Sequence, residues 1–84
     1  GEVTGSVLSG GVYVEEGALV EDSVIMPNSV IKKGAVVRRA IIAERVVVGE
    51  DARIGEETGR IAVVGSGTKV PKGHKLAAGE QMGK

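Results

Sequence analysis

The chain has 84 residues, with 11 basic and 11 acidic side chains, a formal net charge of zero, and no Phe, Trp or Cys. This length allows one small domain, whose core must be built from Val, Ile, Leu and Ala. The balanced charge argues against binding to nucleic acid or to a membrane surface. No apolar run is long enough for a membrane helix, and no signal peptide is visible. The lack of cysteine favours a cytoplasmic location.

Aliphatic residues recur along the chain with a period of 17. Three columns share this period: Val3, Val20, Val37 and Ile54; Leu8, Ile25 and Ile42; Val14, Ile31 and Val48. Within each cycle these positions are 6, 6 and 5 residues apart. The residue four places after each of these aliphatic positions is usually small or β-branched. These residues are Val12, Ala18, Val24, Ser29, Ala35, Ile41, Val46 and Ala52.

Turn residues separate the aliphatic positions, as in "EEG", "PN", "KKG" and "GED". After Ile54 the register slips, and it returns at Val64, 22 residues after Ile42. Because 22 is 17 plus 5, we place a five-residue insertion within "GEETGR". We therefore expect one domain over residues 1–84, with coils over about 3–54, the insertion at about 55–60, and a last coil and tail over about 61–84.

This pattern predicts an all-β fold, a parallel β-helix of hexapeptide repeats with about four coils. Three short faces per turn each place one aliphatic side chain inward, and successive coils stack about 4.8 Å apart. A β-sandwich of short strands is the competing fold, but it does not require a repeated period of 17. So short a solenoid should be marginally stable alone, and we expect it to self-associate through its coil ends or its outward apolar columns.

Several ordered segments carry a family resemblance: "SVL" before a glycine-containing turn, "VEDSVIMP", "RRAIIAERVVVGEDARIG" and "AVVGSGTKVPKGHKLAAGEQ". Together they resemble the C-terminal domain of bacterial glucose-1-phosphate adenylyltransferase (ADP-glucose pyrophosphorylase). The resemblance implies left-handed coiling and a non-catalytic domain for assembly and allosteric regulation. The parent enzyme would make ADP-glucose and diphosphate from ATP and glucose 1-phosphate for glycogen synthesis. The alternative is a fragment of a hexapeptide-repeat acyltransferase or of another sugar nucleotidyltransferase.

The resemblance also implies partners that lie outside this chain. They are the N-terminal catalytic domain of the same protein, further copies in a homo-oligomer, and a phosphorylated-metabolite or nucleotide effector. Mg²⁺ is expected for the parent enzyme, whereas this chain is expected to hold no cofactor and no metal. We expect neither nucleic acid nor a membrane as a partner.

Catalytic motifs are missing from the sequence. There is no G-x-x-x-x-G-K-S/T, and a G-x-G-x-x-G begun by Gly65 and Gly67 fails at Val70. The only histidine, His74, falls in the column of Ala18, which suits a corner residue better than a catalytic base. We assign no catalytic residue and expect the chain alone not to be an enzyme.

Charged residues form columns of alternating sign in the predicted register. Lys33 would stack between Glu16 and Glu50, which favours a structural ladder. In the same way Arg38 would lie over Glu21, and Arg39 between Asp22 and Glu56. Arginine suits phosphate because of its planar fork of donors, and three arginines are hypotheses for effector binding: Arg38, Arg45 and Arg53.

Outward apolar positions indicate an interface. A residue that precedes an inward aliphatic residue should point out, which gives one column of Tyr13, Val30 and Val47 and another of Leu19 and Val36. We expect these columns to face a partner subunit or the catalytic domain, although exposed valines are also ordinary in β structure.

Overall fold

The computed structural model describes residues 1–83, which form fourteen strands in three parallel sheets. Sheet A consists of β1 (Glu2–Thr4), β4 (Leu19–Glu21), β7 (Val36–Arg38), β10 (Arg53–Ile54) and β13 (Lys75–Leu76). Sheet B consists of β2 (Val7–Leu8), β5 (Val24–Ile25), β8 (Ala40–Ile42), β11 (Ala62–Val64) and β14 (Gln81–Met82). Sheet C consists of β3 (Tyr13–Val14), β6 (Val30–Ile31), β9 (Val47–Val48) and β12 (Lys69–Val70).

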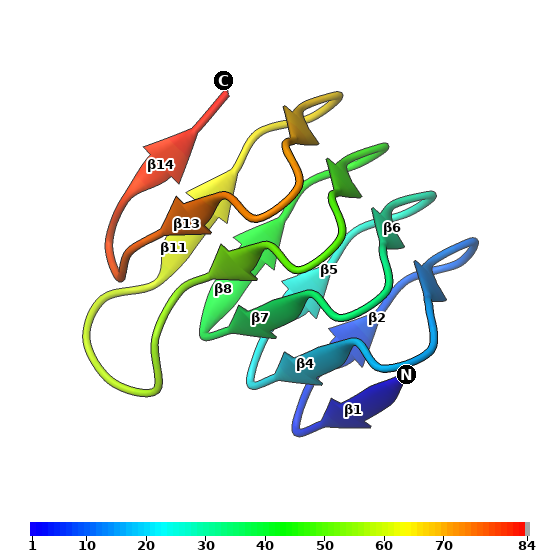
Figure 1. Cartoon of the computed structure of the whole chain (residues 1–84), viewed down its shortest axis with the longest axis horizontal. Coiled ribbons are helices and arrows are strands. Elements are labelled where there is room, and N and C mark those ends of the chain that lie inside the picture. Colours follow the sequence, from blue (N-terminus) through cyan, green and yellow to red (C-terminus); the bar gives the residue numbers. More distant parts are fainter. Residues whose placement is uncertain (84) are drawn as a thin grey trace.

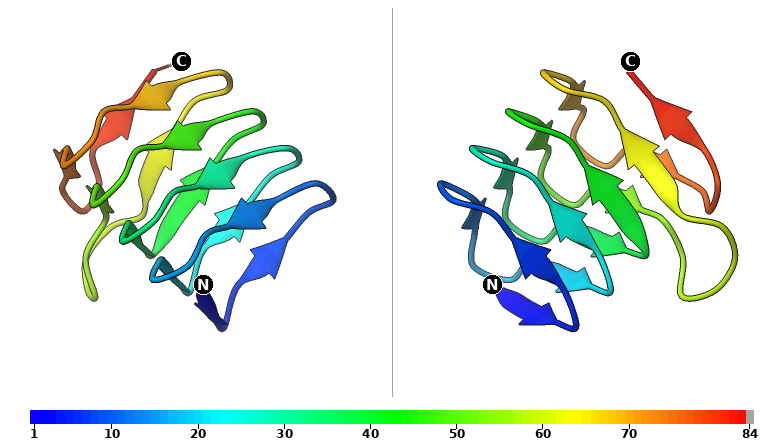
Figure 2. Two further views of the ribbon diagram at one scale, coloured as in Figure 1. Left: turned by 45° about the vertical axis from the view of Figure 1, so that its right-hand side comes forward. Right: turned by 180° about the vertical axis from the view of Figure 1, so that it is seen from behind.

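The three sheets are the sides of a triangular coil (Figure 1). Followed from the N-terminus, the chain winds left-handed through sheets A, B and C in turn, as the rear view also shows (Figure 2). The predicted left-handed parallel β-helix is thus confirmed. It has about five turns rather than the four expected, because Gln81 and Met82 pair with Val63 and Val64 as a further strand. Within residues 1–83 no helix is long and apolar enough to cross a membrane.

The core is a stack of aliphatic layers inside the coil. Register pairs such as Val20 with Val37 and Ile25 with Ile42 bring residues 17 apart into contact. Side chains of the middle turns are fully buried, including Val20, Ile25, Ile31, Val37, Ile42, Val48 and Ile54. The columns predicted from the period are therefore confirmed, and every side chain in them is small enough for the narrow interior.

Two corners of the coil use buried serines to join successive turns. Ser29 Oγ donates to the Ala43 carbonyl at 2.6 Å and accepts from the Val46 amide at 3.0 Å. Ser23 Oγ likewise donates to the Glu21 carbonyl at 2.7 Å and accepts from the Ala40 amide at 3.1 Å. Each hydroxyl satisfies a backbone amide of the next turn that would otherwise be buried without an acceptor.

One side of the coil is shorter than the other two, because its inward aliphatic residues follow the preceding ones after five positions rather than six, as Ile25 follows Val20. On this side the small inward residue does not lie where the spacing predicts it. The spacing predicts Val24 and Ile41 in the small-residue position, four places after Val20 and Val37. This placement is wrong: Ser23 and Ala40 hold that position, 3% and 2% exposed, and Val24 and Ile41 point outward. The shorter side has one residue fewer in its corner, so the inward position falls three places after the preceding aliphatic residue rather than four.

The register changes once, between β10 and β11. Arg53 pairs with Val36, 17 residues earlier, whereas Ala62 pairs with Ala40, 22 residues earlier. The additional residues form a loop that projects from the corner between sheets A and B (Figure 1). Arg39 Nη2 donates to the Gly59 carbonyl at 3.0 Å and so ties this loop to the preceding turn.

Candidate functional site

The three arginines considered for effector binding do not share one site. Arg38 and Arg53 lie on neighbouring strands of sheet A, two residues out of register with each other. Arg45 lies at the corner between sheets B and C, where its amide donates to the Pro27 carbonyl at 3.1 Å. Any effector site on this chain can therefore use Arg38 and Arg53 together or Arg45, but not all three.

Arg38 is engaged in a structural ion pair. Its Nε lies 2.9 Å from Glu21 Oε1 on the adjacent strand, and the two side chains are 31% and 35% exposed. This confirms the predicted stacking of Arg38 over Glu21. An ion pair at this exposure contributes little stability, about 0.2–1 kcal/mol, but it occupies one edge of the guanidinium.

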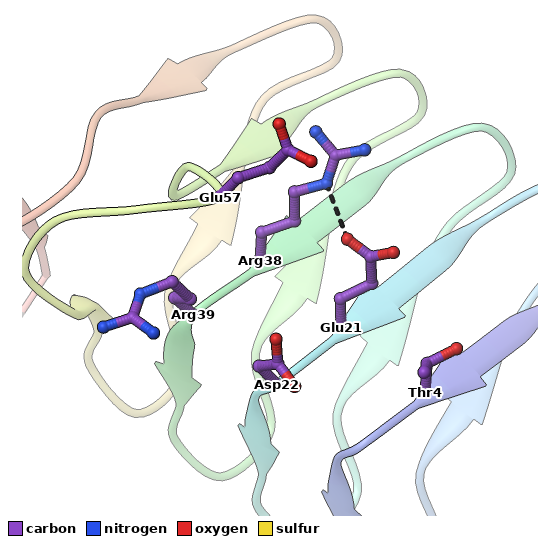
Figure 3. Close-up of a pocket in the computed structure, with 6 residues that line it drawn as sticks. All are labelled: Thr4, Glu21, Asp22, Arg38, Arg39 and Glu57. Atoms are coloured by element: carbon purple, nitrogen blue, oxygen red, sulfur yellow. Dashed lines mark hydrogen bonds and ion pairs between the residues drawn. The ribbon is translucent and has the colours of Figure 1, made fainter.

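A shallow hollow of about 250 Å³ surrounds this ion pair (Figure 3). It is lined by Thr4, Glu21, Asp22, Arg38, Arg39 and Glu57. Three carboxylates against two guanidinium groups give the lining an acidic balance. The hollow is therefore a poor place for a phosphate, and Arg38 is the weaker effector candidate on sheet A.

Arg39 departs from the predicted ladder between Asp22 and Glu56. Figure 3 shows its guanidinium turned away from Asp22, and its donors reach the Gly59 carbonyl instead. Gly59 belongs to the inserted loop, so the loop supplies an acceptor for Arg39 that the regular period does not predict.

Arg53 has a different environment at the other end of sheet A. It lies directly opposite Lys75 on β13, and both side chains are exposed. A hollow of about 320 Å³ adjoins the pair and also includes Gly55, Glu56, Leu76, Ala77 and Glu80. Its two carboxylates, Glu56 and Glu80, balance the two cations, whereas the hollow at Arg38 has three carboxylates against two cations. Glu80 Oε1 also accepts from the Ala77 amide at 2.7 Å. Opposed like charges repel, so an anion bound between Arg53 and Lys75 would relieve an unfavourable contact.

The predicted outward columns lie on sheets C and A. On sheet C, Tyr13, Val30 and Val47 pair in register, and Tyr13 is 65% exposed. On sheet A, Leu19 pairs with Val36 and both are half-buried. These residues do point outward, and their role as an interface stays a prediction.

A third outward column, on sheet B, was missed by the sequence analysis. Val7, Val24, Ile41 and Val63 pair in register along successive turns, so it is the longest aliphatic column on the outer surface of residues 1–83. Val7 is 61% exposed and Val24 38%. The right view of Figure 2 faces this sheet. The sequence contains the signal for this column, because each of its residues directly precedes an inward residue. Val7, Val24 and Ile41 precede Leu8, Ile25 and Ile42, and Val63 precedes Val64, which continues that inward column after the insertion.

The one histidine of the sequence is His74. His74 occupies the corner position of Ala52 one turn later, as predicted: its carbonyl accepts from the Arg53 amide, as that of Ala52 accepts from Val36. No group of three or more His, Cys, Asp or Glu side chains in the described part of the chain could hold a metal ion.

Comparison with protein families identifies the repeat. The model of the family described as "GlmU-like, C-terminal hexapeptide" matches residues 1–64. The chain belongs to this family. It is a family of the sugar nucleotidyltransferase and acyltransferase type, in agreement with the broader part of the resemblance found in the sequence. No curated protein and no solved structure gave a significant match.

Proposed function

We propose that this chain is the non-catalytic assembly and regulatory domain of a sugar nucleotidyltransferase. The observation that carries the proposal is that the outer surface of the coil is rich in aliphatic columns. Each of its three sheets presents an outward aliphatic column, and the described residues contain no group of three or more His, Cys, Asp or Glu side chains that could hold a metal ion. Such a surface suits protein contacts rather than chemistry.

The parent enzyme in this proposal is a glucose-1-phosphate adenylyltransferase. It joins ATP and glucose 1-phosphate to give ADP-glucose and diphosphate, with Mg²⁺ bound in its own catalytic domain, for glycogen synthesis. The ordered motifs from Ser6 to Gly55 and the later "AVVGSGTKVPKGHKLAAGEQ" support this choice among sugar nucleotidyltransferases. The family match supports the wider class.

The regulatory part of the proposal rests on Arg53 and Lys75. Their opposed positive charges form the described pair best placed to receive a phosphorylated metabolite or a nucleotide. Arg53 can offer two parallel N–H donors to a phosphate, and Lys75 adds a point charge. Bound at this place, an anion would hold β10 and β13 together at the end of sheet A.

A second candidate is favoured by the family description, which covers acyltransferases as well. In that case the chain is part of a hexapeptide acyltransferase that acts with residues from other parts of the protein. The coding sequence upstream of residue 1 separates the two. A glycine-rich nucleotidyltransferase loop there supports the first candidate, and its absence supports the second.

Assembly can be tested by substitution in the intact protein. Val30→Glu together with Val47→Glu places two charges in the outward column of sheet C without touching the core. We expect the oligomer to dissociate, as measured by light scattering. Lys69→Glu is the matched control, because it changes an exposed charge on the same sheet next to Val47. An unchanged oligomer with the double substitution would contradict the assembly role of this face.

A further inference from the structure

Sheet B has an uncharged outer face. No residue in its strands is charged, which within residues 1–83 holds for this sheet alone. Because side chains alternate along a strand, the residues on either side of each inward residue point outward and form two columns along the solenoid. The first column is Val7, Val24, Ile41 and Val63, and the second is Ser9, Met26, Ala43 and Gly65. The face is therefore an apolar surface, on which Met26 is 40% exposed.

The second column changes in side-chain size from turn to turn. Met26 follows β5 and is its largest member, whereas Ala43 follows β8 one turn later and is small. If a second copy faces this sheet across a two-fold axis that runs parallel to the strands, midway between β5 and β8, β5 lies opposite β8 of the second copy. Met26 then lies over Ala43 of the second copy, and the same contact is made twice. A large side chain over a small one allows two sheets to pack closely.

The charges beside this face fit the same arrangement. Asp22 and Arg39 occupy successive turns of the corner between sheets A and B, and Asp22 is exposed. The two-fold axis runs this corner of one copy against the same corner of the other in the opposite direction, so Asp22 lies opposite Arg39 of the second copy. Arg39 uses Nε and Nη2 for the Gly59 carbonyl, and these bonds leave Nη1 to meet a carboxylate.

We propose that two copies of this chain pack face to face through sheet B as an antiparallel pair, with the two-fold axis between β5 and β8. The interface is isologous, so each contact occurs twice. A face of short strands is small, and we expect a pair that dissociates on dilution. The inference concerns sheet B alone, so it can fail without affecting the assembly role proposed for sheet C or the proposed reaction of the parent enzyme.

A parallel pair, with the two-fold axis along the solenoid, has poorer charge contacts. It sets the corner between sheets A and B against the corner between sheets B and C at the same turn. Asp22 would then face the uncharged Asn28, and Arg39 would face Glu44 and Arg45, whose charges cancel. Opposed charges fix register and orientation at an interface, so they favour the antiparallel pair.

The inserted loop also has room in the antiparallel pair. It projects from the corner between sheets A and B just before β11 (Figure 1). The turn of the second copy that faces β11 is that of β2, whose corner consists of Gly5 and Ser6. These are the smallest corner residues on this side, so the loop meets little steric hindrance there.

Cross-linking of introduced cysteines tests the register, because the 84 residues contain no cysteine. The intact protein that contains this chain is produced with Val7→Cys in some copies and Val63→Cys in the others, and a short bismaleimide is added. We expect links between positions 7 and 63 of different copies, identified by mass spectrometry of the linked peptides. Val7→Cys alone should give few links, because the antiparallel pair holds its two copies three strands apart, about 14 Å along the axis.

Three results of this experiment would overturn the antiparallel pair. Links between two copies of Val7→Cys would show a parallel pair. Links from Val7→Cys to another part of the intact protein would show that a different domain covers sheet B. No links in either sample would show that sheet B does not face a second copy. Both substituted residues point outward, so the core is not disturbed.

Charge exchange provides a second measurement on the same cross-link. Asp22→Arg should raise the protein concentration needed for half-maximal linking about fivefold, because it creates two repulsive contacts in each pair. Arg39→Asp added to the same chain should restore linking, since both contacts are then attractive again. Asp51→Arg is the matched control and should leave linking unchanged. Asp51 also has a positive φ and lies over a glycine of the preceding turn, but at the corner between sheets C and A.

Circular dichroism shows whether each of these variants keeps its strands. An equal loss of linking with Asp51→Arg, or a folded double variant that does not recover, would overturn the contact between Asp22 and Arg39 and with it the proposed register.

Discussion

Arg53 on β10 lies directly opposite Lys75 on β13, so two exposed positive charges share adjacent positions in sheet A. No other strand pair in residues 1–83 sets two like charges opposite each other, and Arg38 instead contacts the oppositely charged Glu21. A pair of like charges at this position costs stability. We therefore expect this pair to serve binding rather than folding.

Lys75→Glu should stabilise the isolated chain by about 0.5 kcal/mol at low salt, because it replaces repulsion by attraction across two strands. Urea unfolding at low and high salt measures this, and the gain should shrink as salt rises. Lys69→Glu is the control, since Lys69 lies opposite the uncharged Val47. Equal effects of the two substitutions would show that the Arg53 contact does not matter.

Ser29→Ala should lower the free energy of unfolding by about 1–3 kcal/mol. Ser29 is fully buried, and its loss leaves the Val46 amide and the Ala43 carbonyl without a partner. Urea denaturation measures the change, with Ser66→Ala as a control at an exposed turn. A loss no larger than that of the control would mean that the hydroxyl is not needed at this corner.

Ile41 and Ile42 are neighbours with opposite orientations, and they provide a sharp test of the register on sheet B. Ile42 is fully buried, so Ile42→Ala should cost about 2–5 kcal/mol. Ile41 is half-buried on the outer face, so Ile41→Ala should cost less than about 1 kcal/mol. Denaturation of both variants under one set of conditions gives the comparison, and the reverse order would place β8 in the wrong register.

Arg45 holds a backbone conformation that favours glycine, with φ at 54°. The column of this corner also contains Gly11 and Gly67 with positive φ. Arg45→Gly should therefore stabilise the chain by about 0.5–1 kcal/mol, since a left-handed conformation strains a residue with a Cβ atom. Arg53→Gly, inside strand β10, should destabilise it by about the same amount. Thermal unfolding of the two variants measures both effects, and stabilisation by both would remove the conformational explanation.

Most of the fold could be predicted because the repeat itself encodes the contacts. A period of 17 places Val20 on Val37, and the step of 22 after the insertion places Ile42 on Val64, as the strand pairs show. The alternation of inward and outward residues then predicts the columns of Tyr13 and Leu19. Left-handed coiling came from the family resemblance and not from spacing, since usual crossover preferences favour the opposite hand.

The errors lie where one side of the coil differs from the other two, or where one turn differs from the next. A uniform count of four positions failed for Val24 and Ile41, because the shorter side loses a residue within its corner. The ladder predicted for Arg39 does not account for its hydrogen bonds, because the carbonyl of Gly59 in the inserted loop accepts from its guanidinium. The three arginines divide between two places on the coil, and the period itself contains this division. Arg45 falls at a corner between the strands of sheets B and C, whereas Arg38 and Arg53 fall within strands of sheet A.

The most direct test of the proposed function is nucleotidyl transfer by the intact protein that contains this chain. Diphosphate release should be followed from ATP and glucose 1-phosphate in the presence of Mg²⁺, with separation of the nucleotide sugar product. We predict that ADP-glucose forms, that a phosphorylated metabolite or nucleotide changes the rate, and that Arg53→Ala raises the effector concentration needed. Transfer of an acyl group to a sugar, without any nucleotide sugar formed, would contradict the proposal.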